Sequence, residues 1–271
     1  MRAAIDNSLP GNHHFLKDYP KKTLKNKDLM FQDKFRKRQH FISKKAGRAI
    51  HDYRMIEDGD RILVGVSGGK DSLSLLKILE DRKKFVPIKY DVIAMHVDFG
   101  YHCLGPDLLA DYFKRHGYEY RIKKVDILKK GQSRADITCF WCSWNRRKTI
   151  FKAAESLGCN KVALGHHKDD IVETVLLNLF FLGEISGMRP RQELFGGKLT
   201  LIRPLAYVME EEIRGFAKTL DFPIQRCKCP NSFTSKRTFV EKIIAQIKEE
   251  CPDVKTNIFN SLKRIKKDYL L

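Results

Sequence analysis

The chain has 271 residues, a formal net charge of +19 and a hydrophobic fraction of 42%. This length suits one large domain or a core domain with extensions. No apolar run approaches the ~18–20 residues that a membrane span needs, and the N-terminus has no apolar signal core, so we expect neither membrane insertion nor secretion. Seven cysteines, an odd number, argue against a disulfide scaffold and favour a reducing compartment, which we take to be the cytoplasm.

The positive charge lies mainly at the two ends of the chain. Residues 1–54 hold 14 Lys and Arg against 5 Asp and Glu, and residues 213–271 hold 13 against 6, whereas the middle is nearly neutral at +3. Two basic ends around a near-neutral core suit a polyanionic partner such as a nucleic acid. A lysine-rich solvated surface without a partner is the alternative that charge alone leaves open.

The N-terminal part combines an irregular stretch with a helix. The first 30 residues are polar and interrupted by proline and glycine, which predicts irregular structure. Over 33–56, Ile42, Ala46 and Ala49 recur at helical spacing among many cations, which predicts a basic amphipathic helix.

From residue 61 onward, strands alternate with helices. Strands are predicted over 61–66, 90–98, 118–127, 161–167 and 198–205. Helices are predicted over 72–79, 107–117, 144–158, 169–183 and 209–221, and two further basic amphipathic helices over 236–250 and 257–271. This order predicts an α/β fold with an open, mainly parallel five-stranded sheet and helices on both faces. Ligands of such sheets bind at the carboxyl ends of the strands.

Two further expectations concern the organisation of the chain. The helix over 169–183 is nearly all apolar, which predicts that it is buried. We divide the chain into a basic N-terminal extension over 1–52, a catalytic domain over 53–225, and a C-terminal segment over 226–271 that carries cysteines and basic helices.

The segment VGVSGGKDS, residues 64–72, predicts a phosphate site. The first strand ends at Val66, a glycine turn follows, and Asp71 and Ser72 open the next helix as its caps. Glycines let backbone N–H groups approach an anion, the helix N-terminus adds its dipole, and Lys70 adds a positive charge. The P-loop pattern G-x-x-x-x-G-K-[ST] does not fit, because Asp71 follows Lys70.

A second polar cluster follows the fourth predicted strand. Gly165, His166, His167, Asp169 and Asp170 stand between that strand and an apolar helix. Because parallel strands end at the same edge of a sheet, this cluster is expected to lie beside the glycine turn.

Four cysteines have the spacing of possible metal ligands. Cys139 and Cys142 form a C-x-x-C pair, and Cys227 and Cys229 form a C-x-C pair further along the chain. From the residues alone, a Cys₄ zinc site, a redox dithiol and a three-ligand iron–sulfur cluster all remain possible.

The two polar motifs resemble known signatures. SGGKDS resembles the SGGxDS loop of the PP-loop ATP pyrophosphatases, and GHHKDD resembles the GHHxDD signature of their tRNA-modifying branch. Enzymes of that superfamily bind ATP and release pyrophosphate, leaving an acceptor oxygen adenylated. The resemblance implies ATP contacts from Val66, Ser67, Gly68, Gly69, Lys70, Asp71, Ser72, His96 and Gly165. It also implies catalytic roles for Lys70, Asp169 and Asp170, the two aspartates serving magnesium or acting as a general base, with Glu173 a weaker candidate.

Over about residues 35–254 the chain resembles the TtcA group of tRNA thiolases. The shared segments include CFWCSWNRRKTIFKAA and IRPLAYVMEEEIRGFAKTLDFPI. This resemblance implies a [4Fe-4S] cluster held by Cys139, Cys142 and a third, distant cysteine. Cys227 is the preferred third ligand because it is the first cysteine after the shared segment DFPI. Cys229 is the alternative, because the second cysteine of this pair stands one residue closer here than in the family. Arg146 is a possible supporting residue.

The same resemblance implies a reaction and its partners. Family members convert cytidine 32 of tRNA to 2-thiocytidine, so we expect ATP, magnesium and tRNA, and a sulfur donor (a cysteine desulfurase or sulfide). The resemblance also implies a homodimer. Three alternatives remain: a uridine 2-thiolase with the same chemistry, a lysidine synthetase-like ligase, and a zinc-stabilised RNA-binding protein with a vestigial ATP site.

Overall fold

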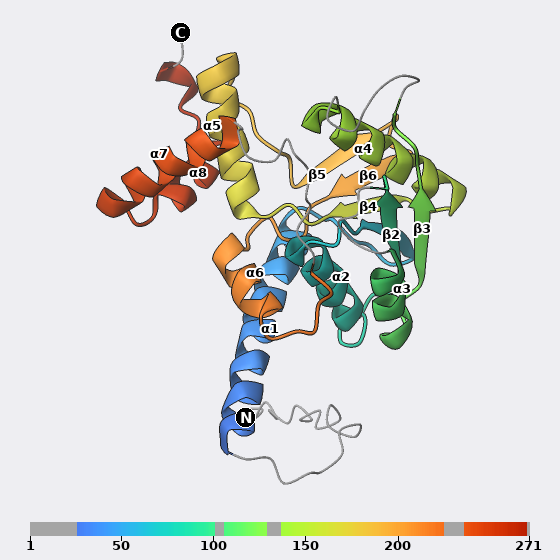
Figure 1. The fold of residues 1–271 in the computed structure, drawn as a ribbon. Helices are drawn as coiled ribbons and strands as arrows, with labels where there is room; N and C mark the ends of the chain where they lie inside the picture. Colours follow the sequence, from blue (N-terminus) through green and yellow to red (C-terminus); the bar gives the residue numbers. More distant parts are fainter. Residues whose placement is uncertain (1–25, 101–105, 129–136, 225–235, 270–271) are drawn as a thin grey trace, which may run out of the picture.

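The structure is a computed structural model that describes residues 26–100, 106–128, 137–224 and 236–269 (Figure 1). Its helices are α1 (Asn26–Asp52), α2 (Lys70–Arg82), α3 (Pro106–Arg115), α4 (Cys139–Ser156), α5 (Lys168–Leu182), α6 (Glu210–Ala217), α7 (Lys236–Glu250) and α8 (Val254–Ser261), with a short 3₁₀ helix at Lys267–Tyr269. Its strands are β1 (Asp60–Gly65), β2 (Tyr90–Asp98), β3 (Tyr120–Lys124), β4 (Lys161–Leu164), β5 (Arg191–Leu194) and β6 (Leu199–Ile202).

One sheet holds all six strands in the order β3-β2-β1-β4-β6-β5. The first five strands in this order are parallel, and β5 pairs with β6 in the antiparallel direction. The α/β class and the mainly parallel sheet are therefore confirmed, but the predicted number of five strands was one too low. The missing strand, β5, is polar because it lies at an edge and has a single neighbour. Its Phe195–Gly196–Gly197 turn, with positive φ at each residue, was the hairpin signal in the sequence.

Helices cover both faces of the sheet, as predicted (Figure 1). On one face, apolar side chains of α1, α2, α3 and α6 pack with those of β1 and β2 in one continuous core, which includes Ile42, Leu76, Phe113 and Phe216. On the other face, α4 packs against β1, β2, β4 and β6 through Ile150 and Ala154, among others. The carboxyl ends of β1 and β4 lie between these two layers. They carry the glycine turn and the GHHKDD segment.

A separate apolar cluster joins α5, α7 and α8, which lie together to one side of the sheet (Figure 1). Ile171 and Val172 in the first turns of α5 are buried in it. The second half of α5 is different, because Phe180 and Leu182 are 49% and 65% exposed. The prediction that this whole helix is buried was therefore wrong: its second half runs beyond the sheet, and α7 covers it only in part, through Phe239 against Phe181.

Several helix boundaries differ from the predicted ones. α4 begins at Cys139 rather than at residue 144, because Thr138 caps it by accepting a hydrogen bond from the Trp141 N–H (3.2 Å). α1 begins earlier, at Asn26. The last helix, α8, ends at Ser261 instead of continuing to residue 271, and a dense run of Lys and Arg follows its end.

None of the described helices is long and apolar enough to cross a membrane.

Candidate functional site

The glycine turn connects β1 to α2 and is held by its own serines. Gly68 has a φ of +85°, in the left-handed region that favours glycine. The Ser72 hydroxyl donates to the Gly69 carbonyl (3.0 Å) and accepts from the Ser67 N–H (3.1 Å). Gly69 is the N-cap of α2 and has no side chain to cap the first turn. The turn therefore presents a helix N-terminus whose amides suit an anion.

Lys70 stands at the start of α2 between two carboxylates. Its ammonium lies 3.1 Å from Asp71 Oδ1 and 3.0 Å from Glu210 Oε1, at the start of α6. Burial alone would lower the pKa of Lys70, but the charges and hydrogen bonds of Asp71 and Glu210 outweigh burial and raise it. Any phosphate that binds Lys70 competes with Glu210. Sequence reasoning missed Glu210, which shares an acidic first turn with two other glutamates and stands out only in space.

Gly165 brings the second motif against the first. A Cβ atom at Gly165 would lie 2.9 Å from the backbone nitrogen of Ser72 and 3.0 Å from its Cα, closer than packed atoms allow. The end of β4 therefore touches the N-terminus of α2 backbone to backbone. This contact confirms that the two motifs lie at the same edge of the sheet.

His166 follows Gly165 and is paired with Arg203, which lies just after β6. The Arg203 Nε donates to His166 Nδ1 (3.3 Å), so the neutral ring carries its proton on Nε2. Burial, together with the nearby charge of Arg203, lowers the pKa of His166 to about 4. Arg203 itself is 7% exposed, and burial lowers its pKa to about 10. Sequence reasoning did not single out Arg203, although an arginine directly after a buried strand was a signal.

His167 is buried among three carboxylates. Its Nε2 lies 3.3 Å from Asp170 and 3.9 Å from Asp71, and its Nδ1 lies 3.6 Å from Asp169. Burial would lower the pKa of His167, but the Asp169 carboxylate beside its Nδ1 and the charges of Asp170 and Asp71 outweigh burial and raise it. A protonated His167 partly neutralises the acidic cluster.

Asp169 ties α5 to two other helices. It accepts hydrogen bonds from the Glu210 N–H (2.8 Å) and from the Lys255 ammonium of α8. Burial would raise the pKa of Asp169, but the nearby His167 ring and the hydrogen bonds from Lys255 and the Glu210 N–H hold it well below its usual range. These contacts give Asp169 an anchoring role in the fold.

Asp170 has a similar set of contacts. Its Oδ2 accepts from the His167 N–H (2.9 Å), as in a capping box, and its Oδ1 lies 2.6 Å from Nη2 of Arg237 in α7. The Nε of Arg237 also lies 2.5 Å from Glu173. Arg237 and Lys255 were missed from sequence, because nothing distinguishes them from the other cations of the C-terminal helices.

His96 and Arg146 lie at the end of β2. His96 is 7% exposed, and its Nδ1 is 2.8 Å from the carbonyl oxygen of Val66, so it fixes the start of the glycine turn. Burial lowers the pKa of His96, which favours the neutral ring that donates to this carbonyl. The Arg146 guanidinium lies 5.4 Å from the centre of the Phe99 ring, and its buried Nε has no hydrogen-bond partner among the described residues.

Only part of the predicted cysteine set can be placed. Cys142 lies in the first turn of α4 and packs against the core between α4 and the sheet. Cys139 is the first residue of the same helix. Cys227 and Cys229 lie outside the described residues. Within the described residues, no three His, Cys, Asp or Glu side chains are grouped so that they could hold a metal ion.

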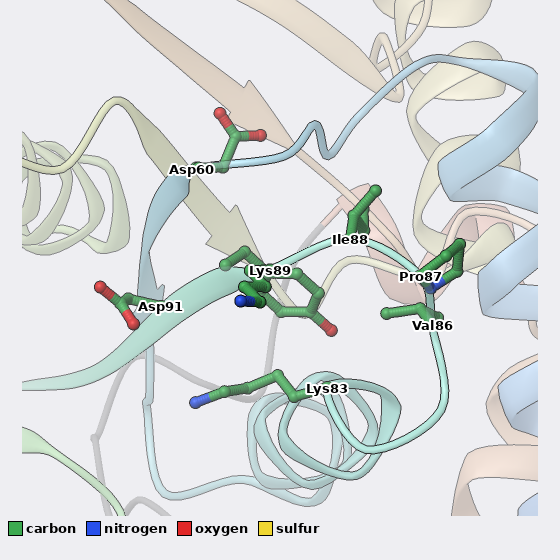
Figure 2. A pocket seen from close by; sticks show the side chains of 9 residues that line it. Asp60, Lys83, Val86, Pro87, Ile88, Lys89 and Asp91 are labelled. Atoms are coloured by element: carbon green, nitrogen blue, oxygen red, sulfur yellow. The ribbon is translucent and has the colours of Figure 1, made fainter.

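A cavity of about 410 Å³ lies elsewhere, at the amino ends of β1 and β2 (Figure 2). Asp60, Lys83, Lys89 and Asp91 are among its lining residues. This is the opposite edge of the sheet from the glycine turn, so the cavity takes no part in the site.

Comparison with known proteins agrees with this geometry. A family model described as a PP-loop domain matches residues 39–227. A tRNA-cytidine(32) 2-sulfurtransferase from Geobacter sulfurreducens is 40% identical over 235 residues, which cover 85% of this chain and 91% of that protein. One from Ralstonia nicotianae is 39% identical over 246 residues, covering 89% of this chain and 79% of that protein.

Among solved structures, the U34-tRNA thiolase NcsA from Methanococcus maripaludis, with its [4Fe-4S] cluster, has a TM-score of 0.66 to this chain. It is 25% identical, and the match covers 83% of this chain and 79% of that chain. The chain therefore belongs to the PP-loop family and, within it, to the tRNA-cytidine(32) 2-sulfurtransferases.

Proposed function

We propose that this protein is an ATP-dependent tRNA sulfurtransferase that converts cytidine 32 to 2-thiocytidine. The observation that carries the proposal is the backbone contact of Gly165 with Ser72, which joins the SGGKDS loop and the GHHKDD segment into one site. A phosphate loop and an acidic segment at the same sheet edge suit a reaction that transfers AMP and releases pyrophosphate.

The loop residues are the proposed ATP site. The turn Ser67–Gly69, the first amides of α2 and the Lys70 ammonium hold the pyrophosphate that leaves. Val66, His96 and Gly165 line the strand ends, where the adenosine part binds. The Lys70–Glu210 ion pair opens when phosphate enters, because the phosphate takes the place of the Glu210 carboxylate.

Magnesium fits the carboxylates at this edge by their chemistry, since it prefers oxygen ligands and substrate phosphates. The buried Oδ1 of Asp71 accepts no hydrogen bond from the described residues, although the Lys70 ammonium lies 3.1 Å away. We assign magnesium to Asp71 and Asp170, with Asp170 also available as a general base once Arg237 withdraws. Asp169 holds the site together through α6 and α8.

The cysteines are the proposed ligands of an iron–sulfur cluster. Cys139 and Cys142 stand at the first turn of α4, and thiolates are the ligands that such clusters require. With Cys227 as the third ligand, or Cys229 in its place, a bound cluster would keep one iron open to hold the sulfide that attacks the activated base. Arg146, beside the cysteine pair, would stabilise negative charge there.

The reaction has two bond-exchange steps. The C2 oxygen of the cytosine attacks the α-phosphorus of ATP, which forms a base–AMP bond and expels pyrophosphate. Sulfide then attacks C2, the C2–O bond breaks, and AMP leaves with the former base oxygen while sulfide loses its proton. No net oxidation or reduction occurs when the donor is sulfide. The target base must leave its stack to reach the strand ends.

The partners follow from this chemistry. The basic N- and C-terminal parts bind the tRNA backbone, and the sulfur comes from sulfide, or from the persulfide of a cysteine desulfurase after a thiol has reduced it to sulfide. The homodimer and the cytoplasmic location stay predictions from the sequence.

A uridine 2-thiolase is the second candidate function. It is supported by the similarity to NcsA, which is a U34-tRNA thiolase. The chemistry at C2 is the same, so the two functions differ only in how the base is selected.

Isotope transfer tests the mechanism. A tRNA transcript with ¹⁸O at C2 of cytosine is incubated with ATP, magnesium, sulfide and the protein carrying its cluster. The proposal predicts one ¹⁸O atom in each AMP formed. Unlabelled AMP formed without sulfur transfer would mean that the protein hydrolyses ATP and does not activate the base.

A further inference from the structure

The first turns of α4 carry an exposed aromatic and cationic face beside the C-x-x-C pair. Phe140, Trp144 and Lys148 recur every four residues and therefore share one side of the helix. Phe140 is 74% exposed and Trp144 is 44% exposed, and Arg147 and Lys148 are exposed next to them. We call these four residues the aromatic face. Exposed aromatic groups that adjoin a reaction site indicate a binding surface.

The Trp144 ring is held in a fixed orientation. It stacks on Trp141, with ring centres 5.5 Å apart and planes 16° from parallel. Trp141 is itself anchored, because its Nε1–H donates to the carbonyl oxygen of Ile127 (3.2 Å). The Lys148 ammonium lies over the Trp144 ring, 4.8 Å from its centre. The ring is thus a flat surface of fixed orientation with a cation over it.

The aromatic face lies close to the proposed chemistry. Cys142 and Arg146 occupy a neighbouring side of the same helix, four residues apart. Arg146 contacts Phe99, which directly follows the carboxyl end of β2. A polymer bound on this face can therefore place an adjoining group at the strand ends.

We propose that the aromatic face binds an RNA base next to the target nucleotide, by stacking on Phe140 and Trp144. Arg147 and Lys148 pair with the phosphates on either side. This inference rests on the proposed function. Extruding the target base leaves its neighbours without a stacking partner, and aromatic side chains replace that partner in single-stranded RNA recognition. Lys148 gives up its ring contact for a phosphate, which suits its flexible stem.

Cations rather than carboxylates border the two rings, and this favours a polyanion over an apolar protein segment as the partner. The stacking does not depend on base identity, because every base has a flat π surface. The aromatic face therefore positions the RNA, and selection of cytidine is left to the strand ends.

Intrinsic fluorescence reports directly on this face. The chain has two tryptophans, Trp141 and Trp144, and both belong to the stack. The probe is a short anticodon stem–loop RNA with cytidine at position 32, added to the full-length protein carrying its cluster. We expect the RNA to quench the tryptophan emission, and the quenching to be greatly reduced in Trp144→Phe.

Affinity measurements separate stacking from charge. Phe140→Leu and Trp144→Leu should each weaken RNA binding by about 5- to 100-fold, which corresponds to ~1–3 kcal/mol per stacked base. Trp144→Phe should retain most of the affinity. Lys148→Gln should lower the slope of the log association constant against log salt concentration by about one, which is the contribution of one phosphate contact. Phe85→Leu is the matched control, because Phe85 is 55% exposed with the Arg82 guanidinium 5.5 Å from its ring, at the opposite edge of the sheet.

The outcomes are distinct. Loss of affinity in the two Leu variants but not in Phe85→Leu, with unchanged circular dichroism, supports the inference. Equal affinity in all three variants overturns it while leaving the proposed function intact. Unchanged fluorescence with RNA, combined with loss of cluster or stability in the Leu variants, would mean that the protein's own chain covers the face. Absence of RNA binding by the unmodified protein would overturn the proposed function as well.

Discussion

Arg237 of α7 neutralises Asp170 of the GHHKDD segment, with Nη2 2.6 Å from Oδ1. The same guanidinium lies 2.5 Å from Glu173, so one cation serves two partly buried carboxylates. Lys255 of α8 pairs with Asp169 in a similar way. The C-terminal helices are thus attached to the acidic side of the site by charge as well as by the apolar cluster around Ile171.

Removing Arg237 should therefore destabilise the protein. In Arg237→Ala, Asp170 and Glu173 lose their counter-charge, and burial then raises the free energy of both carboxylates. We expect the free energy of unfolding to fall by about 1–3 kcal/mol, less than for a fully buried pair because Arg237 is partly exposed. Urea denaturation followed by circular dichroism measures the change. Lys242→Ala, an exposed cation on the same helix, is the control and should change little; equal effects of the two would mean that the ion pairs contribute nothing specific.

Gly165→Ala should disturb the contact between the two motifs. The new Cβ would meet the Ser72 backbone nitrogen at 2.9 Å, and a backbone cannot move aside as a side chain can. We expect a loss of about 1–3 kcal/mol in the free energy of unfolding, together with weaker ATP binding measured by calorimetry. Gly215→Ala in α6 is the control, since its Cβ would meet only the Arg38 side chain at 3.5 Å and alanine favours helix. Unchanged ATP affinity in Gly165→Ala would show that the glycine does not shape the ATP site.

Lys70 and Glu210 should have opposite effects on nucleotide binding. Lys70→Ala removes the cation proposed to hold pyrophosphate, and we expect the Kd for ATP to rise at least about 10-fold, or ~1.4 kcal/mol. Glu210→Gln removes the carboxylate that lies 3.0 Å from the Lys70 ammonium, and should therefore lower the Kd for ATP. The backbone N–H of residue 210, which donates to Asp169, is retained in that variant. A higher Kd in Glu210→Gln would indicate that Glu210 positions Lys70 for phosphate instead of competing with it.

His166 should make the protein lose stability on acidification. Its pKa is about 4 in the folded protein against 6.5 for an ordinary histidine, so the unfolded chain binds more protons between these values. The stabilising contribution is complete above pH 6.5 and is lost as the pH falls towards 4, by about 3 kcal/mol. His166→Gln should remove this part of the pH dependence in urea denaturation. NMR titration of the imidazole gives the pKa directly, and a value near 6.5 would contradict the buried pairing with Arg203.

The positions of the motifs could be predicted from the sequence because local rules determine them. The strand before the glycine turn and the helix after it were recognisable from the hydrophobic pattern and the glycine turn, and parallel strands place their ends together. The predicted caps, Asp71 and Ser72, were wrong, because the helix begins at Lys70 with Gly69 as its N-cap. β5 was not predicted because a polar edge strand has no hydrophobic pattern. The exposure of the second half of α5 was not predicted because an apolar sequence cannot show whether another layer covers it.

The contacts that complete the site were not predictable from the sequence. Arg237, Lys255, Arg203 and Glu210 reach the acidic segment from separate elements, and only the packing of those elements brings them together. Each is one cation or carboxylate among many in a highly charged chain. The cysteine assignment stays a prediction, since Cys227 and Cys229 lie outside the described residues.

Nucleoside analysis of tRNA tests the central claim most directly. Unmodified tRNA is incubated under anaerobic conditions with ATP, magnesium, sulfide and the protein carrying its cluster, then digested and analysed by mass spectrometry. The account predicts 2-thiocytidine at position 32, absent when ATP is omitted or when Cys139 and Cys142 are both replaced by alanine. Formation of 2-thiouridine in its place would mean that the protein has the second candidate function, a uridine 2-thiolase with the same chemistry. AMP formation without any sulfur-containing nucleoside would contradict the assignment as a tRNA sulfurtransferase.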